Sequence, residues 1–89
     1  MNDVLKENMK ERLASKKSQL KRARKRRTFH SNQLVDLIEE FAESIEGTGN
    51  YYFLQSEIDK TINIIASFED EIEWLESEID AIKKMEEYF

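Results

Sequence analysis

The chain has 89 residues, with no proline, no cysteine and only two glycines, Gly47 and Gly49. This composition excludes disulfides and cysteine-ligated metal sites, and it predicts one helical domain that is interrupted at the glycines. Charged residues make up 37% of the chain and hydrophobic residues 39%, whereas globular proteins have about 25% and about 45–50%. We therefore expect an all-α fold that is elongated or oligomeric, because there is little material for a compact core.

The net charge of -5 hides two halves of opposite sign. Residues 1–30 contain eleven lysines and arginines against three carboxylates. Residues 31–89 contain three lysines against sixteen carboxylates. Such an asymmetry indicates either charged partners or pairing between the two halves.

The first predicted element is a basic helical arm over residues 1–30. Its heptad pattern is sound from Val4 to Leu13 but weak further on, where Arg27 and His30 fall at core positions. Thr28 is one of several residues here that are suited to cap a new helix. The sequence therefore leaves two architectures open, a long antiparallel helical hairpin or a three-helix arrangement with a break near residues 28–31.

The second predicted segment covers residues 31–46, and a turn covers residues 47–50. The segment has a regular apolar stripe from Leu34 to Ile45. Gly47 is suited to a left-handed C-terminal cap, and Thr48 or Asn50 to the N-cap of the next helix.

The last predicted element is an acidic coiled-coil helix over residues 51–89. Apolar residues recur there at alternating steps of three and four from Tyr51 to Phe89, with Thr61 and Glu86 as the polar exceptions. A heptad pattern sustained over about five repeats is typical of a left-handed coiled coil. Together with the short supply of apolar residues, it predicts a homodimer.

A chain that folds back at the glycines brings the two charged halves together. The residue numbers that face each other would then sum to about 97, so residues 10–27 would lie beside residues 70–87. Basic residues would meet acidic ones along this length. The same complementarity is equally suited to contacts between two chains, and the sequence does not separate these cases.

Six cations in seven residues form the sharpest local feature, which we name the basic tract. It consists of Lys21, Arg22, Arg24, Lys25, Arg26 and Arg27. Clustered arginines on a helix are suited to contact the phosphates of DNA or RNA. The alternatives are pairing with the acidic helix and a solvated helical surface.

The acidic residues of the last helix form a second candidate, which we name the acidic strip. It consists of Glu69, Asp70, Glu73, Glu76 and Asp80. Carboxylates three or four positions apart on a helix are separated by roughly 4.5–6 Å along its axis, the scale of phosphate spacing on a nucleic-acid strand. In charge pattern the helix resembles small phage-type inhibitors of nucleic-acid-binding proteins. The strip therefore predicts a DNA-mimic inhibitor or regulator that occupies the basic surface of such a protein.

Apolar residues outside the heptad pattern are expected to widen the core into a bundle or a dimer interface. Among them, Trp74 is either a buried structural residue or a hydrophobic anchor for a partner. If no charged partner exists, the protein has a third possible function. It is then a purely structural coiled-coil oligomerisation module.

The sequence gives no grounds for an enzyme. His30 is the only histidine, and the many carboxylates single out no acid–base pair. We expect no catalytic residues, no metal site and no cofactor. The chain has no signal-like or membrane-spanning apolar run, so we expect a cytoplasmic protein without a membrane partner.

Overall fold

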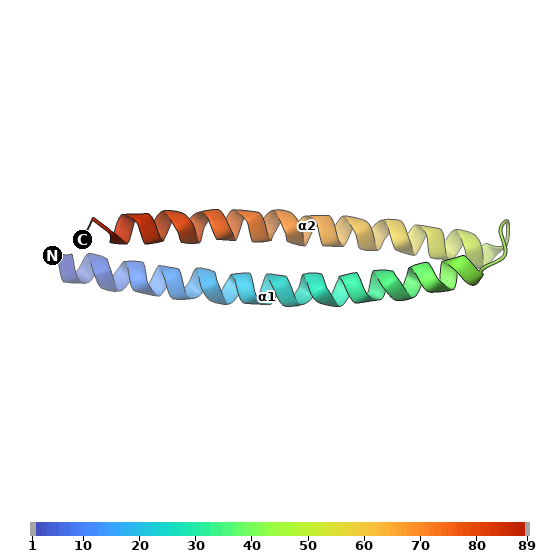
Figure 1. Cartoon of the computed structure of the whole chain (residues 1–89), viewed down its shortest axis with the longest axis horizontal. Helices are drawn as coiled ribbons and strands as arrows, with labels where there is room; N and C mark the ends of the chain where they lie inside the picture. Colours follow the sequence, from blue (N-terminus) through green and yellow to red (C-terminus); the bar gives the residue numbers. More distant parts are fainter. Residues whose placement is uncertain (1, 89) are drawn as a thin grey trace.

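The computed structural model describes residues 2–88 and shows an all-helical hairpin (Figure 1). Helix α1 spans Asn2–Glu43, and helix α2 spans Gly49–Glu86. The two helices run antiparallel along their full lengths, so the start of α1 and the end of α2 lie at the same end of the molecule. The hairpin is a narrow rod whose Cα atoms extend over 67 × 14 × 14 Å.

Helix α1 continues without interruption through residues 28–31, so the three-helix alternative does not occur. The hydroxyl of Thr28 donates a hydrogen bond to the backbone oxygen of Arg24 at 3.0 Å, one turn back in the same helix, and does not cap a new helix. His30 lies in the seam between the helices and stacks on Phe68 at a centroid distance of 5.7 Å. An aromatic contact thus replaces the missing aliphatic residue at this heptad position.

The turn lies over residues 44–48, slightly earlier than predicted, because α1 ends at Glu43 and α2 begins at Gly49. Gly47 has a φ of +85°, the left-handed conformation that glycine adopts at little cost, but it sits within the turn and does not directly cap α1. Thr48 is the N-cap of α2, and its hydroxyl accepts a hydrogen bond from the amide of Tyr51. Of the predicted range 51–89, Phe89 lies outside the described residues.

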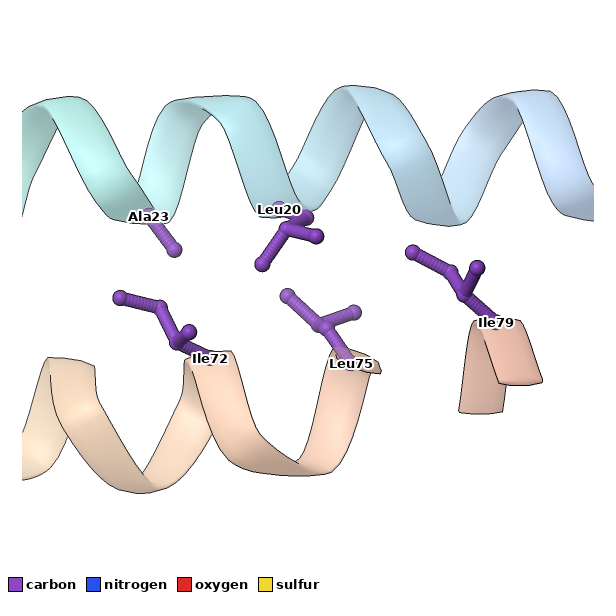
Figure 2. Packing of buried hydrophobic residues seen from close by; sticks show 5 residues of the cluster. All are labelled: Leu20, Ala23, Ile72, Leu75 and Ile79. Atoms are coloured by element: carbon purple, nitrogen blue, oxygen red, sulfur yellow. The ribbon is translucent and has the colours of Figure 1, made fainter. Parts of the chain in front are cut away.

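The predicted heptad positions form the seam between the helices. The best-packed cluster lies in the half that is remote from the turn, where α1 and α2 meet in interdigitated apolar side chains (Figure 2). It contains Leu20, Ala23, Ile72, Leu75 and Ile79. Leu75 is the most buried of them, at 1% exposure, and Ala23 leaves room for the side chains opposite.

Two aromatic contacts cross the seam of the antiparallel hairpin. His30 meets Phe68 near the middle of the rod, and Phe41 meets Tyr51 near the turn, with ring centroids 4.7 Å apart. Thr61 is a buried polar residue in this seam, and its hydroxyl donates to the backbone oxygen of Glu57 at 2.8 Å. The buried hydroxyl of Thr61 is therefore hydrogen-bonded, although it lies at a polar heptad position.

Candidate binding faces

Two lateral sides of the rod can be defined by contacts between the helices. On one side, Nη2 of Arg24 lies 3.1 Å from Oε1 of Glu76. On the other side, Nζ of Lys16 lies 4.3 Å from the ring centroid of Trp74. Residues seven positions apart lie two turns apart on nearly the same face of a helix. We name these surfaces the Arg24 side and the Trp74 side, and heptad spacing assigns the other residues to them.

The acidic strip lies on the Arg24 side and the adjoining outer surface of α2. All five of its carboxylates are exposed. Glu76 pairs with Arg24 across the seam, and Oδ2 of Asp80 lies 3.1 Å from Nζ of Lys84 one turn further along α2. The neighbouring acids Glu71 and Glu78 fall on the Trp74 side by the same spacing. The structure therefore separates the carboxylates of α2 into two surfaces.

The basic tract spreads around α1 and does not form one face. Arg27 is half-buried at a seam position, while the other five cations are exposed. Within residues 2–88, Arg24–Glu76 is the only direct ion pair between the helices. The alignment of opposite charges is thus present, but most of these charges face solvent.

Trp74 is half-exposed, so the interpretation of it as a buried structural residue is wrong. Its ring packs beneath the ammonium group of Lys16 in a cation–π contact. About half of Trp74 stays exposed, and its alternative role as a hydrophobic anchor for a partner stays a prediction.

The apolar residues outside the heptad pattern do not widen the core of the single hairpin. Thirteen large hydrophobic residues in the described chain are at least 40% exposed. Near the turn, four of them share the Arg24 side, and we name them the apolar patch: Val35, Ile38, Tyr52 and Ile62. The exposed alanines Ala42 and Ala66 share the same flanking positions. Their common side is not evident from the sequence until the seam of the hairpin is known.

An open groove follows the Arg24 side between the helices at the end remote from the turn. Its walls include Lys17, Lys21 and Arg24 from α1, and Ile79 and Lys83 from α2. The groove is thus basic along α1 and continuous with the acidic strip on α2. It offers charged groups for binding, with no histidine or hydroxyl pair arranged as a nucleophile and base.

His30 packs among a glutamine and two phenylalanines. Its Nδ1 atom lies 3.1 Å from Oε1 of Gln33, and its ring contacts Phe29 and Phe68. No group of three or more potential metal ligands occurs among the described residues. Over the same residues, neither helix is long and apolar enough to cross a membrane.

The chain was compared with known protein families, curated proteins and solved structures. No family model, curated protein or solved structure matches it. The two charged surfaces and the exposed apolar side chains are therefore the features from which a function can be inferred.

Proposed function

We propose that this protein is a non-enzymatic binding protein whose acidic strip occupies the basic surface of a nucleic-acid-binding protein. One observation carries the proposal. The five carboxylates of the acidic strip remain exposed on one continuous surface of α2, although a strongly basic helix packs alongside. A DNA-mimic inhibitor needs such a surface.

The geometry of the strip favours an extended basic groove as its partner. Asp80 lies eleven positions after Glu69, which corresponds to roughly 16 Å, or about three helical turns. We propose that the seam is a left-handed coiled coil, which would keep this surface regular. The negative net charge of the chain would steer it toward a positive surface and speed association at low salt.

The proposal is tested by capture from a cell extract that has been treated with nuclease. The immobilised chain should retain basic nucleic-acid-binding proteins, and short duplex DNA should elute them, because DNA and the acidic strip compete for the same surface. Salt should weaken the capture, since the contacts are between exposed charges.

The decisive variant is Glu69→Lys with Glu73→Lys, which should abolish DNA-elutable capture. The matched control is Glu71→Lys with Glu78→Lys, which makes the same charge change on the Trp74 side and should retain capture. Equal capture by both variants, or bound proteins that DNA does not displace, would contradict the proposal.

A second candidate is direct binding of DNA or RNA through the basic tract. The observation in its favour is that Lys21, Arg22, Lys25 and Arg26 are exposed while Arg24 alone pairs with α2. Each phosphate that is neutralised makes the binding constant for duplex DNA more sensitive to salt.

A gel-shift titration at several salt concentrations separates the two candidates. If the basic tract binds nucleic acid, the intact chain should shift duplex DNA at low salt, and Arg22→Gln with Arg26→Gln should weaken the shift. If the intact chain gives no shift at low salt, the second candidate is excluded and the first is unaffected.

A further inference from the structure

The Arg24 side of the hairpin consists of two zones. The end remote from the turn carries a charged zone, with basic residues on α1 and, apart from Lys83, acidic residues on α2. It contains Lys10, Lys17, Lys21 and Arg24, and Glu73, Glu76, Asp80 and Glu87, all of which are exposed. The end near the turn carries the apolar patch, and the exposed Asp59 shares its flanking positions.

We propose that a second copy of this chain packs on the Arg24 side with its turn at the same end, which produces a parallel, two-fold symmetric four-helix bundle. In such a dimer the two-fold axis runs along the rod, so α1 of each copy faces α2 of the other. The interface is isologous, and each contact therefore occurs twice. Bundles of this kind bury apolar flanking positions that a lone hairpin leaves exposed.

The charged zones match in this arrangement. Since both turns lie at the same end, residues across the interface meet at nearly the same levels as residues within one hairpin. Lys17 then lies opposite Asp80 of the second copy, Lys21 opposite Glu76, and Arg24 opposite Glu73. Each exposed pair contributes only about 0–1 kcal/mol, but the combined pattern selects the orientation and the register.

The apolar patches match at the other end of the same interface. Val35 lies at the level of Ile62 of the second copy, and the exposed Ala42 and Ala66 leave space for larger neighbours. The reverse orientation, with the turns at opposite ends, would place the apolar patch of each copy on the charged zone of the other. Burying charges against apolar side chains is unfavourable, so the sequence disfavours that dimer.

The size of the Arg24 side is sufficient for a stable dimer. The Cα envelope of 67 × 14 Å corresponds to on the order of 900 Å² per copy, close to the roughly 800 Å² per partner of standard interfaces. The core of the single hairpin is thin, with eight buried hydrophobic residues in the part of the chain that the structure describes. Dimerisation would add a second apolar layer near the turn, where the hairpin has its fewest buried residues.

This inference deepens the proposed function, because it names what covers the same acidic face before a partner arrives. The dimer would mask part of the acidic strip and part of the basic tract at once. A basic partner protein would then compete with self-association for the strip. The claim of competition rests on the proposed function, whereas the dimer itself does not.

A charge-swap experiment tests the dimer. Molar mass is measured by sedimentation equilibrium at low salt for the intact chain and for two variants: Lys17→Glu with Lys21→Glu, and Glu76→Lys with Asp80→Lys. The intact chain should be a dimer, each variant alone should self-associate at least about tenfold more weakly, and an equimolar mixture of the two should recover the dimer. Circular dichroism verifies that both variants remain helical.

The control is Arg22→Glu with Arg26→Glu, which changes the charge equally but on the Trp74 side. This variant should dimerise like the intact chain. A monomeric intact chain at low salt overturns the proposal. It is also overturned if the control variant loses the dimer as strongly as the swap variants, or if the mixture stays monomeric.

A distance measurement tests the orientation without altering the interface. The described chain contains no cysteine, so Glu46→Cys places a single spin label at the turn. Two labels at the same end of a bundle should give a short distance, on the order of 20–30 Å allowing for helix diameters of ~10–12 Å and the label arms. A distance near the 67 Å length of the rod would show the reverse orientation and overturn the proposal.

The two proposals fail separately. A monomeric chain that still captures DNA-elutable proteins overturns the dimer and supports the proposed function. A parallel dimer without any DNA-elutable capture supports the dimer and overturns the proposed function.

Discussion

Arg24 and Glu76 form the only direct ion pair between α1 and α2 in the described chain, with a separation of 3.1 Å. The side chains of both residues are about half-exposed. This contact links the basic tract to the acidic strip and marks the side of the rod on which both proposals depend. The opposite charges of the two halves are aligned along the rod, but most of them are exposed to solvent and form no direct pair between the helices.

We expect the Arg24–Glu76 pair to contribute little to stability. Arg24→Gln should lower the free energy of unfolding by no more than about 1 kcal/mol, because a half-exposed pair is screened by water and salt. Urea denaturation at one fixed protein concentration measures this effect. A loss of several kcal/mol would show that the pair is a principal stabilising contact.

Leu75→Ala should be strongly destabilising. Leu75 is 1% exposed at the centre of the best-packed cluster, and truncating a buried leucine costs about 2–5 kcal/mol. The matched control is Val4→Ala, which truncates a side chain that is 64% exposed and should change stability by less than about 0.5 kcal/mol. Thermal denaturation of the two variants side by side tests whether the stability of the hairpin is concentrated in this cluster.

The two glycines should respond to alanine in opposite ways. Gly47 has a φ of +85°, so Gly47→Ala should cost about 1 kcal/mol through backbone strain. Gly49 begins α2, and nothing lies within 4 Å of the position of an added Cβ. Gly49→Ala should therefore be neutral or stabilising by up to about 1 kcal/mol, since alanine has less freedom to lose on folding. Similar losses in both variants would contradict the assigned turn conformation.

Trp74 provides an optical probe of the side that the proposed dimer leaves open. Its side chain is 51% exposed and lies on the Trp74 side, so acrylamide should quench its fluorescence readily. Quenching should stay unchanged when the protein concentration is raised through the monomer–dimer transition. If association protected Trp74 from acrylamide, the interface would include the Trp74 side, and the proposed geometry would be contradicted.

Lys83→Glu should strengthen the proposed dimer. Lys83 is the cation of α2 on the Arg24 side, and in the dimer it would lie between Lys10 and Lys17 of the second copy. Replacing it removes a like-charge contact in each half of the interface, so the dissociation constant should fall several-fold, and by less at high salt. Sedimentation equilibrium measures both effects, and Lys60→Glu, which makes the same charge change on the Trp74 side, is the control. Equal effects of the two substitutions would point to net charge as the cause.

Much of the hairpin was predictable from residue spacing. The heptad positions from Leu13 to Phe41 and from Tyr51 to Ile82 identified the seam, because a helix can bury only one stripe against one neighbour. Gly47 and Thr48 marked the turn through their backbone and capping preferences. That α1 continues without a break at Thr28 was not predictable, because a hydroxyl can either cap a new helix or bond inside an existing one, and the contact between His30 and Phe68 across the seam favours the continuous helix.

The sequence by itself determined that this chain is helical, where it turns and which residues face the seam, because these properties depend on local backbone preferences and on periodicity along one chain. Only the tertiary structure decided where the remaining charges and apolar side chains lie. Pairing α1 with α2 placed Arg24 beside Glu76, brought the acidic strip and the apolar patch onto one side, and left Trp74 half-exposed on the other. Those positions depend on the rotation of each helix about its axis, which is fixed when the two stripes meet.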